Sequence, residues 1–468
     1  MSRSALTLKS TIKYIFYLFV FLLPWQIRYI YEKGTLNSEF WEYGTKSLYA
    51  IELLLLIIII LYLAGSAYYI IKADFSKKNK SSKFFSNSKQ ILLAILFLIW
   101  ALLSVAWSKN VSLAWYRWTI LMQGIIVFLF LAKKIVNPRK VFLFFTAGAI
   151  IQSVFGIYQF FVQQILPNKW LGIAEQFPAK FGVSVVQVGD QRWLRAYGSL
   201  QHPNILAAYL GVALLLLILF MPHFFKENKI ESEDLVKEKA IQEGKKFGIS
   251  LIIFLLSIGI ILTFSRAVWL GMAVAIIILV IYLVKNKKLK NIFSIPAIGF
   301  IVLFFLTLFM LKEPILARVT GNERLEIKSN QERMLSYKDG LGIIKDNWLL
   351  GTGIGNYTLE LYKKNPNLSS WDYQPVHSMF MLIWAELGII GLIIFLVFIF
   401  QIIKLALKEK FVLALIIFLL IISLFDHYFW SLYFGVILWW FAMGSILTAH
   451  SLLCCHSALD AESRIEDF

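Results

Sequence analysis

The chain has 468 residues, of which 59% are hydrophobic and only 16% are charged, and its mean hydropathy is +0.71. Soluble domains are about 45–50% apolar and about 25% charged, so this composition excludes a water-soluble globular protein. The net charge of +18 does not indicate nucleic-acid binding, because the lysines lie in short segments between long apolar runs. Such segments are typical of cytoplasmic loops that face anionic lipid. We therefore predict an integral membrane protein that binds membrane lipid and no nucleic acid.

A membrane-spanning helix needs about 17–25 predominantly apolar residues, and runs of this length recur along the chain. They lie at 11–31, 47–71, 90–107, 111–132, 140–165, 203–223, 248–265, 267–285, 293–311, 378–403, 410–425 and 428–449. The first run resembles the apolar part of a signal peptide, but no small-residue cleavage site follows it, so we interpret it as a retained helix. The sequence predicts an all-α polytopic membrane protein with about twelve transmembrane helices.

The basic residues between these runs predict the orientation of the helices. They gather at 72–89, 133–140, 226–246, 285–290 and 404–410. All of these clusters face the same side of the membrane if every predicted helix is real. The positive-inside rule then places both termini in the cytoplasm.

Two longer polar segments fall on the outer side in this arrangement. They are 166–201 and 312–376, and the second forms a large outer loop between helices nine and ten. Within that loop, residues 322–346 have the apolar spacing of an amphipathic helix. We divide the chain into N-terminal helices one and two with a basic loop (1–89), a transmembrane core with both outer loops (90–449), and a cytoplasmic tail past the last helix (450–468).

The tail contains both cysteines of the chain, Cys454 and Cys455, next to each other. Adjacent cysteines cannot cross-link a fold, and the chain has no Cys/His spacing typical of a metal site. They are either an acylation site beside the membrane or two ordinary thiols.

Two arginines at the predicted outer membrane level require an explanation. Arg266 lies between two apolar runs, where an arginine costs roughly 2.5–3.5 kcal/mol, so it either faces a partner or a wet cavity or extends to the headgroups. Arg195 precedes a helix that Pro203 begins and that His202 or Ser199 could cap. The free N–H groups at such a helix end attract anions, although an ordinary interfacial arginine beside a capped helix gives the same pattern.

His377 stands where the large outer loop meets the next apolar run, and Glu386 lies within that run. An imidazole is a natural general base near neutral pH, but a lone histidine here also suits a structural role. An intramembrane carboxylate is either functional or packs helices through hydrogen bonds. The glycine-rich segment at 351–355 follows no Rossmann strand, so we expect a tight turn or a close backbone approach rather than a nucleotide site.

Taken in order, these segments resemble the O-antigen ligase and polymerase superfamily of bacterial membrane glycan transferases. The resemblance covers roughly residues 90 to 445 and includes the large outer loop before the tenth helix. It is carried by Arg195-Ala-Tyr-Gly198, His202-Pro203-Asn204, Phe264-Ser265-Arg266-Ala267, the segment from Arg333 through Gly351-Thr-Gly353-Ile-Gly355-Asn356-Tyr357, and His377 with Glu386-Leu-Gly388. One position departs from the pattern: an asparagine often follows the histidine, and here it is Ser378.

The resemblance implies a fold similar to the C-type glycosyltransferases and an active site at the outer face of the cytoplasmic (inner) membrane. Members of this superfamily take a glycan from an undecaprenyl diphosphate carrier and pass it to an acceptor hydroxyl. By position, Arg195 and Arg266 match the arginines that hold the diphosphate, and His377 matches the base. The supporting residues that it implies are His202, Asn204, Arg333, Gly353, Gly355 and Glu386.

The residue types suit this chemistry. Paired arginines can bind a diphosphate bidentately and stabilise the charge that grows on it as the sugar–phosphate bond breaks. A diphosphate is a good leaving group, so no general acid is needed, and in-line attack inverts the anomeric centre. The outer segments contain no Asp-x-Asp or similar carboxylate pair, so we expect neither a metal nor another cofactor.

The sequence does not identify the acceptor. A ligase of lipopolysaccharide biosynthesis would use the lipid A core, a polymerase another lipid-linked glycan, and an O-oligosaccharyltransferase a protein hydroxyl. The single large outer loop before helix ten favours the ligase layout. A transporter or flippase is a more distant alternative, because about a dozen helices fit one, but the halves show no convincing internal repeat.

Overall fold

The computed structural model describes residues 3–72, 87–221, 235–285 and 295–465. The protein is predominantly helical, as predicted, and every predicted apolar run coincides with a helix over most of its length. Among the described residues, the helices long and apolar enough to cross a membrane are Ser88–Trp107, Val111–Ala132, Pro138–Val162, Pro203–Phe220, Ile241–Leu262, Met379–Ala406 and Tyr433–His450. Shorter apolar helices lie at Ala50–Gly65, Arg266–Tyr282, Ile301–Met310 and Lys410–Phe425. The protein is therefore a membrane protein, and the count of about twelve spans stays a prediction.

The orientation also stays a prediction. The members of the basic clusters at 73–86, 222–234 and 286–290 lie outside the described residues. The helix that contains Cys454 and Cys455 is described, whereas their side chains are not.

The N-terminal prediction was wrong beyond residue 22. Helix α1 (Arg3–Leu22) ends before Pro24, because a proline excludes the residue that precedes it from helical geometry. The residues that follow form two short antiparallel pairs of strands, β1 (Arg28–Glu32) with β4 (Lys46–Tyr49) and β2 (Thr35–Leu36) with β3 (Glu39–Phe40). With a third hairpin, formed by β5 (Val185–Val188) and β6 (Gln191–Leu194), the fold is mostly helical rather than all-α.

The chain forms two compact units. The first comprises Met1–Phe144, Arg333–Lys408 and Ser423–Phe468, and the second comprises Phe145–Glu332 and Glu409–Ile422. Three helices contribute residues to both units, namely α5 (Pro138–Val162), α11 (Arg324–Asp346) and α14 (Lys410–Phe425). The helix predicted at 322–346 is thus confirmed as α11.

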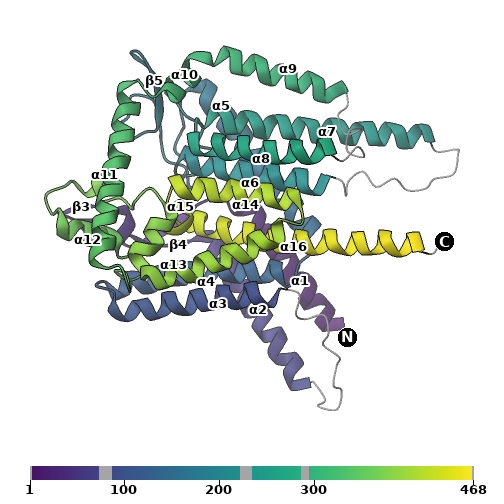
Figure 1. Cartoon of the computed structure of the whole chain (residues 1–468), viewed down its shortest axis with the longest axis horizontal. Coiled ribbons are helices and arrows are strands. Elements are labelled where there is room, and N and C mark those ends of the chain that lie inside the picture. Colours follow the sequence, from purple (N-terminus) through teal and green to yellow (C-terminus); the bar gives the residue numbers. More distant parts are fainter. Residues whose placement is uncertain (1–2, 73–86, 222–234, 286–294, 466–468) are drawn as a thin grey trace. The chain divides into compact units, whose positions relative to one another are not determined.

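The helices of the first unit pack partly through aromatic side chains. Its other helices are α2 (Ala50–Lys72), α3 (Ser88–Leu103), α4 (Val111–Ala132), α12 (Tyr357–Lys364), α13 (Met379–Ala406), α15 (Tyr428–Ser431) and α16 (Tyr433–Ile465). Helix α4 packs along α16, and α3 along α13 (Figure 1). Gly124 of α4 lies against the indole of Trp440 on α16, and Phe128 meets the same indole at 5.6 Å between ring centroids. Such a pair contributes about 0.5–1.5 kcal/mol beyond its buried area.

Helix α16 is longer than predicted. The segment after 449, which we expected to lie past the last helix, is helical as far as Ile465.

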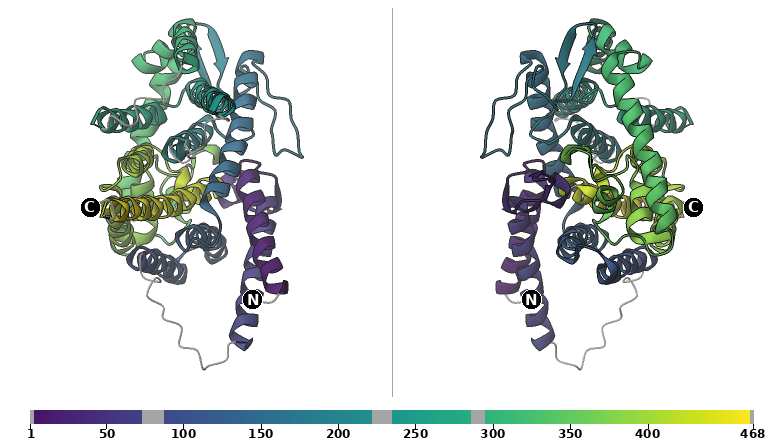
Figure 2. Two further views of the ribbon diagram at one scale, coloured as in Figure 1. Left: turned by 90° about the vertical axis from the view of Figure 1, so that its right-hand side faces the viewer. Right: turned by 90° about the vertical axis from the view of Figure 1, so that its left-hand side faces the viewer.

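The second unit has a helical core and one hairpin. Its elements are β5 (Val185–Val188), β6 (Gln191–Leu194), α6 (Pro203–Phe220), α7 (Leu235–Leu262), α8 (Arg266–Lys285), α9 (Ile295–Met310) and α10 (Lys312–Thr320). Helix α6 packs against α7 and α8, and Gly211 of α6 allows the ring of Phe418 to approach closely. The β5–β6 hairpin lies beside α10, as the two views in Figure 2 show. Its inner face joins a small apolar cluster that includes Ile165, Leu194 and Tyr197.

Candidate active site

In the first unit, the backbone of His377 is held by two side chains of α11. The hydroxyl of Ser336 accepts a hydrogen bond of 3.2 Å from the His377 N–H, and Tyr337 donates one of 3.1 Å to the His377 carbonyl. The imidazole itself is half-buried. Ser378 is the N-cap of α13, and its hydroxyl accepts from the N–H of Met381 at 3.5 Å. Serine and asparagine cap helices about equally well, so the departure from the family pattern preserves this local role.

The turn between α14 and α15 brings Asp426 and His427 to His377. The two imidazole centroids are 5.3 Å apart, and each of the three residues offers a ligand-type atom within 4.8 Å of the other two. Asp426 and His427 are both buried. Sequence reasoning missed this pair. The available signal was an adjacent acid and histidine between two apolar runs, and no local spacing connects them to His377, which lies 49 positions before Asp426 and 50 before His427.

Burial keeps the His427 imidazole neutral. Loss of solvent lowers the pKa of His427 to about 3, the charge of Asp426 opposes that shift, and the charges of His377 and Arg333 add to it. One ring nitrogen, Nδ1, lies 2.6 Å from the hydroxyl of Ser431. That contact fixes the orientation of the ring. The effect of Arg333 on the pKa of His427 shows that its charge acts on this imidazole.

These three groups support two kinds of chemistry. A histidine beside a carboxylate and a neutral imidazole can accept a proton from a hydroxyl, with its neighbours orienting the ring. Two imidazoles and one carboxylate are also ligand types that transition metals accept, so these residues could hold a cation. The expectation that the reaction needs no metal therefore stays a prediction.

The glycine-rich segment approaches a break in α13. Gly388 interrupts this helix with φ 67° and ψ −176°, which the sequence did not predict. The backbone N–H of Thr352 donates to the Ala385 carbonyl, and that of Gly353 donates to the Glu386 carbonyl, both at 2.9 Å. Gly351, Gly353 and Gly355 all have positive φ. The expected close backbone approach is confirmed, and glycine is required because a Cβ at Gly353 would collide with Ser108.

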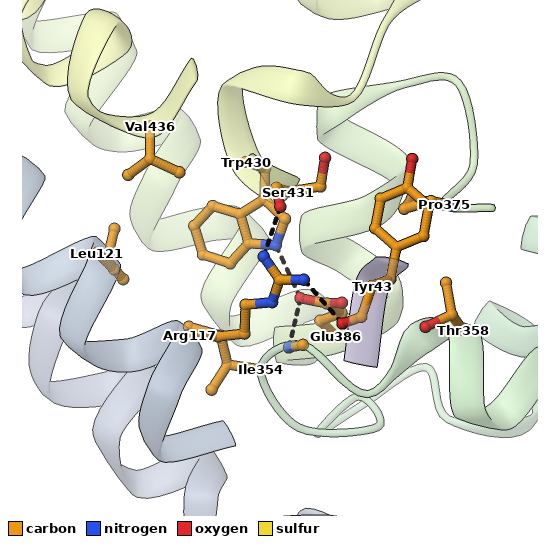
Figure 3. Close-up of a pocket in the computed structure, with 11 residues that line it drawn as sticks. Tyr43, Arg117, Leu121, Ile354, Thr358, Pro375, Glu386, Trp430, Ser431 and Val436 are labelled. Carbon is orange, nitrogen blue, oxygen red and sulfur yellow. Dashed lines mark hydrogen bonds between the residues drawn. The ribbon is translucent and has the colours of Figure 1, made fainter. Parts of the chain in front are cut away.

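Glu386 connects this segment to α15. Its carboxylate is buried and accepts hydrogen bonds of 2.8 Å from the N–H of Gly355 and from the indole of Trp430 (Figure 3). It also accepts one of 3.4 Å from the N–H of Tyr357. Tyr357 begins α12, where a carboxylate satisfies N–H groups that the helix leaves unpaired. The role in packing, which was one of the two readings of Glu386, matches this geometry.

Arg117 of α4, which sequence reasoning also missed, binds backbone carbonyls close to Glu386 and Trp430. Its guanidinium donates to the carbonyl of Ser431 at 2.6 Å and to that of Tyr43 at 2.8 Å (Figure 3). The cavity beside it, lined by Glu386 and Trp430, has a volume of about 20 Å³. That is room for about one water molecule and not for a sugar. Arg117 therefore holds the backbone around α15.

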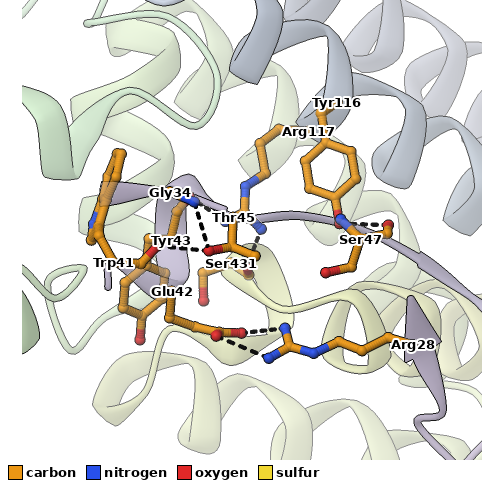
Figure 4. Close-up of polar contacts among 10 residues, drawn as sticks. All are labelled: Arg28, Gly34, Trp41, Glu42, Tyr43, Thr45, Ser47, Tyr116, Arg117 and Ser431. Atoms are coloured by element: carbon orange, nitrogen blue, oxygen red, sulfur yellow. Dashed lines mark hydrogen bonds and ion pairs between the residues drawn. The ribbon is translucent and has the colours of Figure 1, made fainter. Parts of the chain in front are cut away.

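The N-terminal strands complete this part of the first unit. Arg28 forms a two-bond ion pair with Glu42, at 2.5 and 3.0 Å, and the hydroxyl of Thr45 links the Gly34 N–H to the Trp41 carbonyl (Figure 4). This local network fixes the carbonyl of Tyr43 that Arg117 binds.

In the second unit, Arg195 follows β6 and is buried. Its Nε donates to the Thr263 carbonyl at 2.6 Å, and one terminal nitrogen donates to Oδ1 of Asn204 at 2.7 Å. Of the two expected capping residues, His202 is the N-cap of α6: Nδ1 accepts from the Asn204 N–H at 3.1 Å, and Nε2 lies 2.9 Å from the hydroxyl of Ser184. Asn204 therefore binds Arg195 directly, and His202 binds the backbone of Asn204. The supporting role in catalysis that the resemblance implies for both stays a prediction.

Arg266 is the first residue of α8, three positions after Thr263. Its terminal nitrogen donates to Oδ1 of Asn330 at 2.9 Å and lies 3.5 Å from a carboxylate oxygen of Glu326. Its side chain is 26% exposed, so it remains accessible to solvent. The structure thus brings both predicted arginines to the turn between α7 and α8.

The family model described as O-Antigen ligase matches residues 251–396. This part of the chain resembles an O-antigen ligase. The resemblance to the superfamily is confirmed, and the superfamily consists of glycosyltransferase-like enzymes. No curated protein matches the chain.

The matched segment contains most of the predicted site residues. Those within it are Arg266, Arg333, Gly353, Gly355, His377 and Glu386. Arg195, His202 and Asn204 precede the matched segment, and Asp426 and His427 follow it. The structure connects Arg195 to the matched segment through Thr263, and His427 through its contact with His377.

Proposed function

We propose that this protein transfers a glycan from an undecaprenyl diphosphate-linked donor to an acceptor hydroxyl at the outer face of the cytoplasmic membrane. The observation that carries the proposal is the arrangement of Arg195 and Arg266 at one turn of the second unit. A planar guanidinium can bind a diphosphate, which carries about two negative charges, through two parallel hydrogen bonds. The family match supports the glycan as the transferred group.

In this reaction the acceptor oxygen attacks the anomeric carbon of the donor sugar. The bond from that carbon to the phosphate oxygen breaks, and undecaprenyl diphosphate leaves with the bonding electrons. His377 takes the proton of the hydroxyl, and Asp426 and His427 orient its ring. The arginines stabilise the charge on the leaving group, and the anomeric centre is inverted.

The first experiment is deletion of the gene in its native host, followed by gel and mass-spectrometric comparison of surface glycans. Long chains that stay on the lipid carrier beside a bare acceptor identify a ligase. Collapse to one repeat unit identifies a polymerase, and loss of glycan from a protein identifies an O-oligosaccharyltransferase. No change in any glycan would contradict the proposal and favour transport.

Complementation then tests the base. We expect the wild-type gene to restore the profile and His377→Ala to fail, because loss of a general base slows transfer by about 10²–10⁴-fold. His450→Ala, at a histidine of α16 outside the proposed site, is the matched control and should restore it. Equal restoration by His377→Ala would show that this histidine is structural.

A further inference from the structure

A third arginine, Arg318, is buried against the same turn. It lies in the last turn of α10, and its Nε donates to the Phe264 carbonyl at 2.9 Å. One of its terminal nitrogens forms an ion pair with Oε1 of Glu326, which is also buried. The other oxygen of that carboxylate is the one that lies 3.5 Å from Arg266. One carboxylate is therefore shared between Arg318 and Arg266.

The turn that these arginines hold is strained. Phe264 has φ 50°, a left-handed conformation that a bulky side chain rarely adopts and that costs on the order of 1–3 kcal/mol. Arg195 takes the carbonyl of Thr263, and Arg318 takes the next carbonyl along the chain. Two buried guanidinium groups thus fix the carbonyls of the residues two and three positions before Arg266.

The connection from α10 to α11 places the carboxylate. Gly321 ends α10 in the left-handed conformation, with φ 70°, so that the chain reverses and Glu326 returns to Arg318 from the first turn of α11. A cation in the last turn of one helix and an anion in the first turn of the next each match the local helix dipole. The positions of both partners are therefore set by their helices.

We infer that Arg318 and Glu326 are positioning residues for Arg266, and through it for the diphosphate of the lipid-linked donor. This inference rests on the proposed function. Arg318 fixes the strained turn from which α8 starts. Glu326 fixes the position of the Arg266 guanidinium through Oε2, the carboxylate oxygen that is not paired with Arg318. The three arginines Arg195, Arg266 and Arg318 and the carboxylate of Glu326 together carry a net charge of about +2. That charge is opposite and equal to the charge of about −2 on a diphosphate.

The test compares variants of the full-length protein in nanodiscs, with undecaprenyl diphosphate as the probe and its Kd as the readout. Arg318→Leu combined with Glu326→Leu removes both buried charges together, which in other proteins is often neutral for stability. Because the Phe264 carbonyl also loses its donor, we expect the folded double variant to melt at a somewhat lower temperature and to bind the probe about tenfold or more weakly. Arg324→Ala, an exposed arginine at the start of α11, is the control and should bind as the wild type does.

A second variant keeps the test decisive if the double variant fails to fold. Arg318→Lys retains the charge but loses the planar fork that serves Phe264 and Glu326 together, so it should fold and bind more weakly. Wild-type affinity in a folded Arg318 variant, while Arg266→Ala loses binding, overturns this inference alone. Wild-type affinity in Arg266→Ala overturns the diphosphate site itself, and this inference with it.

Discussion

Trp430 donates a hydrogen bond of 2.8 Å from its indole nitrogen to the buried carboxylate of Glu386. Glu386 lies two residues before the break in α13, and Trp430 lies three residues after His427. The same carboxylate binds the N–H groups of Gly355 and Tyr357. One side chain thus connects the glycine-rich segment, α12 and the turn that carries Asp426 and His427.

Replacing Glu386 should therefore cost stability. Glu386→Ala leaves three buried donors without their acceptor, and we expect the free energy of unfolding to fall by about 3 kcal/mol. Thermal unfolding of the purified protein in detergent measures this. Glu332→Ala, at an exposed carboxylate with only a surface pair to Lys328, is the control and should change little. An unchanged melting temperature in Glu386→Ala would show that the hydrogen bonds of this carboxylate do not stabilise the fold.

The low pKa of His427 predicts how stability depends on pH. Burial lowers this pKa from 6.5 in the unfolded chain to about 3 in the folded protein, so the unfolded state binds the extra proton first. The contribution of the neutral His427 side chain to the free energy of unfolding is complete above pH 6.5. It is lost as the pH falls toward 3, by at most about 1.4 kcal/mol per pH unit. Melting temperatures of wild type and His427→Gln between pH 7 and pH 4 test this. The variant should show the shallower slope, and parallel slopes would contradict the assignment.

Arg266 should not tolerate conversion to lysine. If its planar guanidinium binds the diphosphate bidentately, Arg266→Lys should lose transfer activity nearly as completely as Arg266→Ala, because an ammonium group cannot reproduce the fork. Donor turnover by the purified variants measures this, with Arg324→Lys as the matched exposed control. Full activity in Arg266→Lys would argue against bidentate binding.

Removal of divalent cations should leave transfer intact. The prediction follows from the diphosphate leaving group and the arginines, which supply the positive charge that a metal would otherwise provide. The experiment decides between two possibilities, because a cation could also bind to His377, Asp426 and His427. The measurement is the transfer rate with and without EDTA. A loss that magnesium or zinc restores would refute metal independence.

Much of this architecture follows from local sequence. Apolar runs of about 20 residues form helices because the hydrogen bonds of a helix connect residues four apart, so length and hydropathy suffice to place them. The cap at His202, the helix at α11 and the close approach at Gly353 were readable for the same reason. Where prediction failed, at the end of α1, a local signal was present in Pro24.

Tertiary structure decided the composition of the candidate site. His377 was visible in sequence as a titratable group at a loop boundary, but its neighbours Asp426 and His427 come from a turn that follows another helix. Arg318 reads as an ordinary loop arginine until the reversal at Gly321 pairs it with Glu326 beneath Phe264. Hydropathy and periodicity describe one element at a time. Which polar side chains meet depends on how helices pack and where their ends turn, and that is settled by contacts between residues far apart in the chain.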